Sequence, residues 1–383
     1  MQPARDVDTS FAAVLDRLRA AVSWPILCDR IHSCSLAQVD RVLARGSFSP
    51  GDLVALLSPA AAGRLDLLAR RARAVTIQRF GRTILLYAPL YVSNHCMNQC
   101  IYCGFNVRNK LERHALSLDE AVQESGLLRS MGFRHVLLVS GQHEKYAQVD
   151  YLATLSARLR PAFASVAVEV KPLATDEYAR LIASGVDGVT CYQETYHPAT
   201  YADVHLGGPK RDFDWRLGTL ERAATAGIRR IGLSPLYGLD DWRAEAVMAA
   251  HHAQYLGARF WKTQLGISFP RLRGFSGGFV PPRPLDDAGL VQLVCAFRLV
   301  FPDAHLVLST REPAALRDHL MPLGITQMSA ASRTAPFGYS QAHDAGEQFD
   351  VMDTRPAAEV AEAIRHAGYE PVWKDWDAAF LAA

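Results

Sequence analysis

From Ile84 onward, short apolar runs alternate with stretches of amphipathic, helical pattern. The helical stretches have recognisable ends: Ser117-Leu-Asp-Glu120 is a capping box, and Gly132 suits the end of the same helix. Eight of the apolar runs are candidates for buried strands. They cover residues 84–92, 135–140, 166–172, 188–194, 230–236, 266–269, 305–310 and 325–329.

Eight strands that are each followed by a helix predict an α/β fold, a closed parallel (β/α)8 barrel of the TIM type. The runs are too continuously apolar for strands with one face in water, which favours a parallel sheet. An open, doubly wound sheet is the alternative. We expect three parts: an N-terminal helical segment (residues 1–80), the barrel (81–335) and a C-terminal extension packed on it (336–383).

Polar residues follow the predicted strands, and a parallel barrel carries its chemistry at these strand ends. A loop with three cysteines comes directly after the first strand, and Ser140, Lys171 and Glu194 lie at the ends of the next three. Polar groups also end strands five to eight, in residues 234–238, 268–273, 309–312 and 329–333. We therefore expect the active site at the C-terminal mouth of the barrel.

Three of the seven cysteines, Cys96, Cys100 and Cys103, lie within eight residues and are spaced Cys-x3-Cys-x2-Cys. Thiolates are the ligands that hold iron–sulfur clusters, and three so close together can hold three corners of one cluster. The spacing predicts a [4Fe–4S] cluster with three ligated irons and one open iron.

Other interpretations of the cysteine triplet fit less well. A structural zinc ion wants four ligands, and His95 adjoins Cys96 too closely to complete a tetrahedron around the same ion. A disulfide would pair two of the three thiols and leave the third without a partner. On a buried helix the three would share one face, but the poor helix formers among them favour a loop: Asn94, Asn98, Gly104 and Asn106.

The composition argues for a soluble protein of the cytoplasm. A net charge of +2 gives no basic field for nucleic acid or a membrane surface. The N-terminus lacks the apolar core of a signal peptide, and no run approaches the ~20 apolar residues of a membrane span. Four cysteines outside the triplet are expected to be reduced core thiols, which suits a reducing cytosol: Cys28, Cys34, Cys191 and Cys295.

Two strand ends could hold a charged or hydroxylated ligand. Ser140 and Gly141 offer small side chains and backbone amides beside the cysteine loop. Glu194 suits ribose hydroxyls, which need acceptors. Alternatively, Glu194 pairs with Arg216 or Lys171, and the two roles are compatible.

Arg311 follows the very apolar seventh strand, which would deliver its side chain to the barrel mouth. A guanidinium group placed there can clamp a carboxylate with two parallel hydrogen bonds. The alternative is an ion pair with Glu312 or Asp318. Hydroxyl donors that could complete a carboxylate pocket are Tyr91 and either Ser329 or Ser332.

The cysteine stretch, with the aromatic Tyr102 before its last cysteine, resembles the signature of the radical S-adenosylmethionine (SAM) enzymes. The resemblance implies that SAM binds the open iron and that the reduced cluster cleaves SAM to a 5′-deoxyadenosyl radical. In that superfamily a Gly-Gly-Glu-like turn holds the amino group of SAM, and the Ser-Gly-Gln turn here is a looser match. Implied SAM-binding residues are Tyr102, Ser140, Gly141, Glu194 and Arg216.

Seven segments together resemble the 2-iminoacetate synthase family, the tyrosine lyases of bacterial thiamine biosynthesis. They are residues 56–61, 89–96, 103–105, 192–197, 268–273, 308–312 and 371–376, so the resemblance covers nearly the whole chain. It implies that the radical takes a hydrogen atom from the amino group of L-tyrosine and that the Cα–Cβ bond then breaks. The implied products are 2-iminoacetate (dehydroglycine) and p-cresol, with 5′-deoxyadenosine and methionine.

The same resemblance implies partners and site residues. The 2-iminoacetate would pass to thiazole synthase before water destroys it, and an electron donor such as flavodoxin or ferredoxin would reduce the cluster. Arg311 would hold the carboxylate of tyrosine, with Tyr91 and Ser329 as lesser donors.

Three alternatives to a tyrosine lyase follow from the same residues. A related tryptophan lyase shares the cysteine motif and a Ser-Thr-Arg-Glu-like segment, but the tail and residues 56–61 favour tyrosine. A related hydrogenase maturase carries a second cluster on a cysteine-bearing C-terminal extension, whereas no cysteine follows Cys295 here. A non-enzymatic iron–sulfur or zinc-binding module would leave the residues at the other seven strand ends unexplained.

Overall fold

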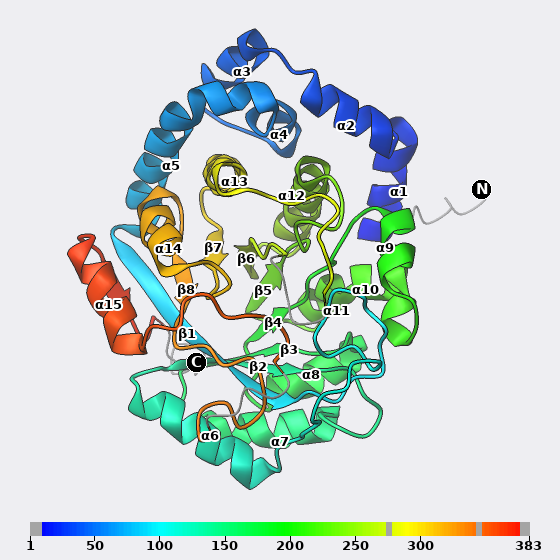
Figure 1. The fold of residues 1–383 in the computed structure, drawn as a ribbon, viewed down its shortest axis with the longest axis vertical. Helices are drawn as coiled ribbons and strands as arrows, with labels where there is room; N and C mark the ends of the chain where they lie inside the picture. Colours follow the sequence, from blue (N-terminus) through cyan, green and yellow to red (C-terminus); the bar gives the residue numbers. More distant parts are fainter. Residues whose placement is uncertain (1–9, 273–277, 342–346, 376–383) are drawn as a thin grey trace, which may run out of the picture.

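Eight parallel strands close into a barrel in this structure, a computed structural model that describes residues 10–272, 278–341 and 347–375 (Figure 1). The strands pair in sequence order from β2 to β8, and β1 pairs with both β8 and β2. The predicted barrel is confirmed, and the open doubly wound sheet is wrong. The barrel strands are β1 (Thr83–Ser93), β2 (His135–Ser140), β3 (Ser165–Glu169), β4 (Gly188–Thr190), β5 (Arg230–Leu233), β6 (Gln264–Ser268), β7 (His305–Leu308) and β8 (Gln327–Ser329).

The first strand is long enough to pair with three others along its length. Residues 83–85 pair with β9 (Glu370–Val372), residues 85–87 with β8, and residues 88–93 with β2. The sequence did not suggest β9, which is only three residues long and contains a proline. It lies outside the barrel on β1 and ties the C-terminal part of the chain to it.

Several strands end earlier than predicted. The third ends at Glu169 rather than at residue 172, the fourth at Thr190 rather than 194, and the fifth at Leu233 rather than 236. The residues that follow remain buried, as Cys191 and Leu236 are, or partly buried, as Val170 is, but they lie in loops at the barrel mouth. An apolar run indicates that its residues are buried, but buried residues can belong either to a strand or to a packed loop.

The helices that surround the barrel follow the strands in turn. The predicted capping box is confirmed, because Ser117 and Glu120 exchange side-chain and backbone hydrogen bonds. The elements are α6 (Leu118–Ser130), α7 (Val149–Leu159), α8 (Thr175–Ala183), α9 (Pro198–Val204), η3 (Pro209–Arg211), α10 (Phe213–Leu217), α11 (Thr219–Thr225), α12 (Trp242–Arg259), α13 (Asp287–Val300), α14 (Ala314–Leu320), η4 (Met321–Leu323) and α15 (Ala357–His366). Two short helices, α10 and α11, meet at Gly218.

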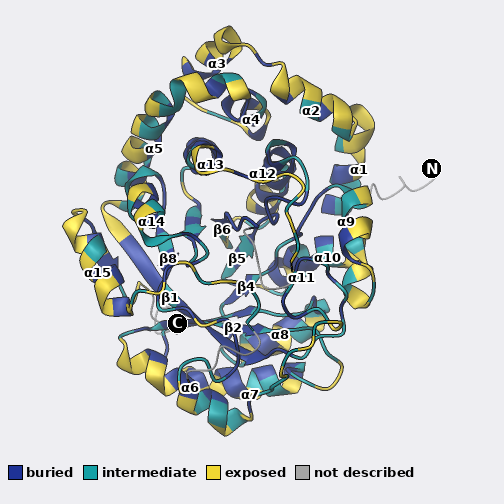
Figure 2. Ribbon diagram, viewed as in Figure 1, coloured by how far each residue is buried: buried dark blue, intermediate teal, exposed yellow. Residues whose placement is uncertain are grey.

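The N-terminal helices form an arc along the side of the barrel, outside α12 and α13 (Figure 1). They are α1 (Phe11–Ala21), α2 (Trp24–His32), α3 (Leu36–Leu43), η1 (Pro50–Asp52), α4 (Leu53–Leu56), η2 (Pro59–Arg64) and α5 (Leu65–Phe80). Figure 2 shows α13 almost wholly buried between this arc and the barrel. A helix that is apolar on all sides needs such enclosure. Gln292 on α13 fixes the arc by donating to the carbonyls of Leu56 and Ser58, both at 2.9 Å.

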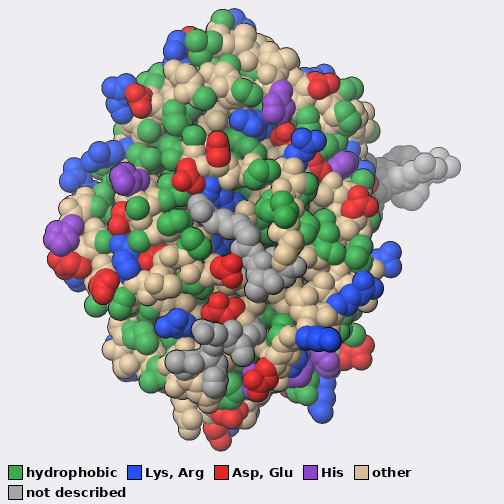
Figure 3. All heavy atoms as spheres, in the orientation of Figure 1, with side chains coloured by type: hydrophobic (Ala, Val, Ile, Leu, Met, Phe, Trp, Pro, Cys, Tyr) green, Lys and Arg blue, Asp and Glu red, His purple; other side chains and the backbone are tan. Residues whose placement is uncertain are grey.

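On the face shown in Figure 3, Lys and Arg side chains are interspersed with Asp and Glu. Such mixing agrees with the formal net charge of +2. Over the described ranges, no helix combines the length and apolarity needed to span a membrane.

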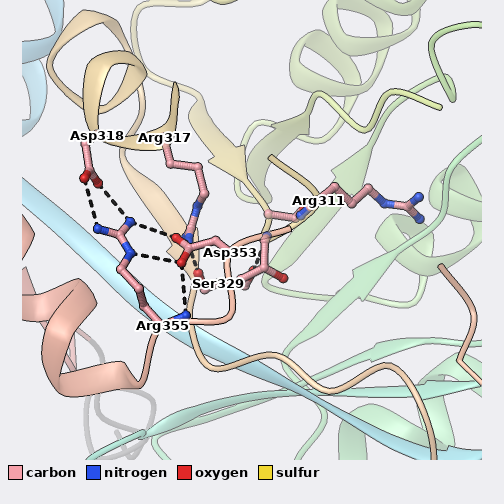
Figure 4. A network of polar contacts seen from close by, with 8 residues as sticks. Arg311, Arg317, Asp318, Ser329, Asp353 and Arg355 are labelled. Atoms are coloured by element: carbon pink, nitrogen blue, oxygen red, sulfur yellow. Dashed lines mark hydrogen bonds and ion pairs between the residues drawn. The ribbon is translucent and has the colours of Figure 1, made fainter. Parts of the chain in front are cut away.

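A buried ion-pair network holds residues 352–355 against the ends of β7 and β8 (Figure 4). Arg317 on α14 pairs with Asp353 and donates to the carbonyl of Ser329, and neither charged side chain of the pair is exposed. Arg355 joins the network by bonding to both Asp353 (2.8 Å) and Asp318 (2.9 Å). The backbone amides of Met352 and Asp353 both donate to the carbonyl of Thr310. The segment that starts at residue 347 is thereby anchored over the barrel mouth.

This network predicts a large loss of stability when its buried carboxylate is removed. Asp353→Asn leaves the buried Arg317 guanidinium without a counter-charge, and breaking a buried pair in this way costs about 3–5 kcal/mol. The free energy of unfolding should fall by that amount in guanidinium chloride unfolding followed by circular dichroism. Glu362→Gln is the control, because its pair with Arg365 is exposed and is worth less than about 1 kcal/mol. Equal unfolding midpoints for the two variants would contradict the structural role of Asp353.

Candidate active site

The loop after β1 carries the three cysteines and contains no helix. It is held to the end of α9 and to the residues beyond it: Gln99 N donates to the carbonyl of Gly207 (2.9 Å) and Ile101 N to that of Val204 (3.1 Å). Cys100 forms an isolated bridge with His205 in the same region. The interpretation of the triplet as a loop, rather than as one face of a buried helix, is confirmed.

Cys96, Cys100 and Cys103 border one cavity, and all three thiols are free of disulfides. Across the described part of the chain, no three His, Cys, Asp or Glu side chains meet at a single ion position. The thiolates of a cluster bind separate irons, so three sulfurs around a shared cavity fit a cluster. Burial raises the pKa of the Cys100 thiol to about 12, so ligation to iron would release its proton.

The turn after β2 forms the wall of this cavity next to the cysteines. Ser140 and Gly141 both line it. A Cβ atom at Gly141 would lie 2.4 Å from the carbonyl oxygen of His95 and 3.0 Å from the Cβ of Cys96. Only glycine therefore allows the turn to pack so closely on the cysteine loop.

Glu194, just after β4, lines the same cavity with a left-handed backbone (φ 73°). Its Oε1 accepts hydrogen bonds from Lys210 Nζ (2.6 Å) and Arg216 Nη2 (3.0 Å). Arg216 also donates to the carbonyl of Tyr192 (2.7 Å), which fixes its orientation. Burial alone would raise the pKa of Glu194, but the two cations outweigh it and hold the pKa below its usual value.

The ion-pair alternative for Glu194 is confirmed for Arg216 and is wrong for Lys171. Lys171 donates to the side chain of Gln148 instead (2.7 Å), and Lys210 is the lysine that pairs with Glu194. Both cations bind Oε1, and no described residue donates to Oε2 of Glu194. One carboxylate oxygen thus remains able to accept a hydroxyl group from a ligand.

Tyr102 is the one sequence-predicted site residue that lines neither cavity at the mouth. Its ring is buried, and its hydroxyl group lies 2.8 Å from Nε2 of His205. Lys210 Nζ lies 5.5 Å from the ring centroid. Tyr102 therefore lies behind the cysteine cavity, where it supports Lys210.

A second cavity lies in the mouth of the barrel lumen. Arg311, Tyr91 and Ser329 all line it, so the structure brings the predicted carboxylate-binding residues together. The guanidinium carbon of Arg311 lies 3.3 Å from the ring centroid of Phe349, in the segment anchored over the mouth. In Figure 4 the Arg311 side chain points away from the buried ion-pair network.

Arg311 forms no ion pair with any carboxylate in the described ranges, and both predicted alternatives are wrong. Glu312 binds Arg271 through two hydrogen bonds of 2.8 and 2.6 Å, and Asp318 binds Arg355. The guanidinium group therefore lines the cavity with its hydrogen-bond donors uncommitted to an anion.

Hydroxyl groups surround Arg311 in the second cavity. Tyr91 donates to Oε1 of Gln348 (2.6 Å), and Ser329 Oγ accepts from the backbone amide of Thr310 (3.1 Å). Ser332 Oγ is buried in the wall and has no hydrogen-bond partner among the residues that the structure describes. A carboxylate ligand would give the Ser332 hydroxyl an acceptor, so this orphaned donor fits an anionic guest.

Sequence reasoning missed three residues that line these cavities: Glu169, Lys210 and Gln348. Glu169 is the last residue of β3, and the strand predicted to run to residue 172 placed Lys171 at the strand end instead. An accurate strand end would have identified it. Lys210 and Gln348 lie in η3 and in an irregular segment, where no pattern in the sequence marks them.

Two protein-family models match the chain. The Radical SAM superfamily model covers residues 90–250, and the Biotin and Thiamin Synthesis associated domain model covers residues 268–370. The first range includes the cysteine loop and the strand ends up to Tyr237. The second includes Arg311 and Ser329.

Solved structures share the fold over most of the chain. HydG, a maturase of the [FeFe]-hydrogenase, superposes with a TM-score of 0.85 at 28% identity over 98% of this chain and 84% of its own. HydG from Carboxydothermus hydrogenoformans gives a TM-score of 0.81 at 34% identity, over 94% of this chain and 82% of its own.

Two curated proteins match nearly end to end. 2-Iminoacetate synthase from Escherichia coli (strain K12) is 47% identical over 363 residues, which are 94% of this chain and 96% of that protein. 2-Iminoacetate synthase from Salmonella typhimurium is 45% identical over the same shares of the two chains. Together with the cysteine loop and the closed barrel, this similarity shows that the chain belongs to the 2-iminoacetate synthase family of the radical SAM superfamily.

Proposed function

We propose that this protein cleaves the Cα–Cβ bond of L-tyrosine to give 2-iminoacetate and p-cresol, for the thiazole moiety of thiamine. One observation carries the proposal: a cavity with an unpaired arginine adjoins the cavity bordered by three thiols. The two cavities share wall residues Val139 and Glu169. An anionic substrate held by Arg311 would therefore lie beside whatever group the cysteines hold.

Cys96, Cys100 and Cys103 would hold the [4Fe–4S] cluster in the cavity that they border. SAM would lie against Ser140, Gly141 and Glu194, with Arg216 and Tyr102 as supporting residues. When bound and reduced, cluster and SAM together supply a 5′-deoxyadenosyl radical. Oε2 of Glu194 suits a ribose hydroxyl, since Lys210 and Arg216 use only Oε1.

Arg311 would bind the substrate carboxylate as a bidentate fork, since its guanidinium group has no carboxylate partner among the described residues. Ser329 and Ser332 would add hydroxyl donors, and Tyr91 would do so by turning its one O–H from Gln348 to the carboxylate. Several fixed contacts to one carboxylate orient the remainder of the amino acid, so that the amino nitrogen can be aimed at the cysteine cavity.

Residues 347–349 would keep water away from the reacting centre. The backbone amide of Gly104 donates to the carbonyl of Gln348 (3.1 Å), and the Gln348 side chain accepts from Tyr91. A Cβ at Gly104 would lie 2.3 Å from the carbonyl of Glu347, so this segment packs directly on the cysteine loop. Exclusion of water protects both a reactive radical and a hydrolysable imine.

We also propose the partners and the compartment. Thiazole synthase would receive the 2-iminoacetate, and a carrier such as flavodoxin or ferredoxin would supply the electron. Both fit work in the cytosol, where a reducing environment keeps free thiols available for a cluster.

The proposed reaction predicts defined products. Anaerobic protein with SAM, reductant and L-tyrosine should yield p-cresol and glyoxylate, the hydrolysis product of 2-iminoacetate, in equal amounts. Liquid chromatography with mass spectrometry measures both. L-Tryptophan is the comparison substrate, and skatole-type products from it with no turnover of tyrosine would overturn the assignment.

The cluster assignment predicts which cysteines matter. Replacing Cys96, Cys100 or Cys103 by Ala removes one of three ligands, so iron content and SAM cleavage should both fall to background. Cys28→Ala, outside both cavities, is the matched control and should keep about four irons per chain. Full iron loading of the Cys100→Ala protein would disprove the site.

The carboxylate clamp predicts a specific defect in Arg311→Lys. An ammonium group cannot copy the two parallel bonds of the fork, and a charge-assisted hydrogen bond is worth roughly 1.5–3 kcal/mol. The kcat/KM for tyrosine should fall at least about tenfold, while the cluster still forms. The ratio of 5′-deoxyadenosine to p-cresol should rise, because the substrate nitrogen is no longer held in place.

Arg333→Lys provides the control for this experiment, since Arg333 is exposed and lines neither of the two cavities. Its product ratio should equal that of the wild type. An unchanged ratio and unchanged KM in Arg311→Lys would rule out the clamp.

A further inference from the structure

Glu169 occupies a unique position among the described residues: it is the one ionisable side chain that lines both cavities. The other shared residue is Val139, its register partner on the neighbouring strand β2. Register partners on parallel strands present their side chains to the same face of the sheet. Val139 and Glu169 therefore form the boundary between the cysteine cavity and the Arg311 cavity.

The carboxylate of Glu169 has no hydrogen bond or ion pair with any other described residue. Glu194, the one other carboxylate among the described residues that line the two cavities, is paired with Lys210 and Arg216. Glu169 is half-buried and its side chain faces the two cavities, so its carboxylate is accessible to a ligand that enters them. An unpaired one at the boundary of two cavities is placed to meet a ligand.

L-Tyrosine brings the complementary group. It binds as an ammonium carboxylate, and Arg311 in the same cavity suits the carboxylate end. Under the proposed function, the nitrogen must face the cysteine cavity and must lose a hydrogen atom. A neutral amine yields a neutral aminyl radical, so one proton has to leave the ammonium group first.

We propose that Glu169 is the catalytic base that receives this proton and that its carboxylate aims the substrate nitrogen at the cysteine cavity. The proton moves from nitrogen to a carboxylate oxygen: one N–H bond breaks, its electron pair stays on nitrogen, and one O–H bond forms. Nothing is oxidised or reduced in this step. The inference rests on the proposed function, since it specifies how the same site handles the amino group.

The electrostatic surroundings suit a base that works near neutral pH. Burial and the neighbouring Glu194 raise the pKa of Glu169 to about 7. As the pH falls through this value, the carboxylate is protonated and can no longer attract or deprotonate an ammonium group. The ionisable groups that face Glu169 are Tyr87, Tyr91, Tyr192, Glu194, Lys210, Arg216 and Arg311.

A binding cycle tests this role without turnover. Cluster-loaded protein with SAM and no reductant is titrated with L-tyrosine and with 3-(4-hydroxyphenyl)propionate, which lacks the amino group. Wild type should bind tyrosine at least about tenfold more tightly than the analogue. Glu169→Gln should lose this preference yet bind the analogue as well as wild type does. The wild-type preference should weaken below about pH 7, because Glu169 is then neutral, and Glu169→Gln should show no such dependence.

Glu144→Gln is the matched control, since it makes the same chemical change at an exposed residue outside both cavities. It should behave as wild type. With reductant present, Glu169→Gln should lose at least tenfold in p-cresol formation, and Glu169→Asp should recover part of it. Iron content and SAM binding equal to wild type show that the Gln variant is folded.

A tyrosine preference that survives in Glu169→Gln would overturn the inference. The binding cycle needs no catalysis, so it tests whether Glu169 binds the substrate nitrogen even if the wild-type protein formed no p-cresol. Absence of p-cresol from the wild-type reaction would overturn the proposed function and not the binding of the nitrogen by Glu169.

Discussion

The closure of the barrel by β1 is the constraint on which the active site depends. Because β1 pairs with both β8 and β2, the ends of all eight strands form a ring instead of a row. In an open sheet, Arg311 after β7 and Glu169 at the end of β3 would lie several strands apart. In the closed barrel they line one cavity in the lumen. The long β1 also carries Tyr91 and leads directly into the cysteine loop, so it connects the Arg311 cavity with the cysteine cavity.

The charges at the mouth divide into paired and unpaired groups. Glu194 is neutralised by Lys210 and Arg216, and Arg317 by Asp353. These pairs fix loops and the C-terminal segment, since a partner lost from a buried pair leaves an uncompensated charge. Arg311 and Glu169 lack such partners within the described ranges, and both line the same cavity. One cation and one anion left free in one cavity match the two ends of an amino acid, which is the physical basis of our proposals for substrate binding.

Much of this site was predictable because the cysteine spacing and the order of strands along the chain are local features of the sequence. The cysteine spacing and the poor helix formers around it indicated a loop, and Arg311 was found because it follows an apolar strand. The predictions failed where burial continued beyond a strand, so that Glu169 was passed over in favour of Lys171. They also failed where contacts join distant segments: Lys210 replaced Lys171 as the partner of Glu194, and β9 paired with β1 unexpectedly. Arg273 and Trp376 belong to two of the segments that resemble the 2-iminoacetate synthase family, and both lie outside the described residues.

The sequence by itself determined the alternation of strands and helices and the spacing of the cysteine triplet, since both depend on residues close together along the chain. It also placed Gly141 at the end of the second strand. Only the tertiary structure decided which charges remained unpaired. Arg311 had two carboxylates nearby in sequence, yet Arg271 and Arg355 bind them, and each comes from a distant part of the chain. An ion pair forms between side chains that are close in space, and this distance cannot be read from their separation in the sequence. The separation of the mouth into two cavities that share Glu169 was likewise decided by packing between strands.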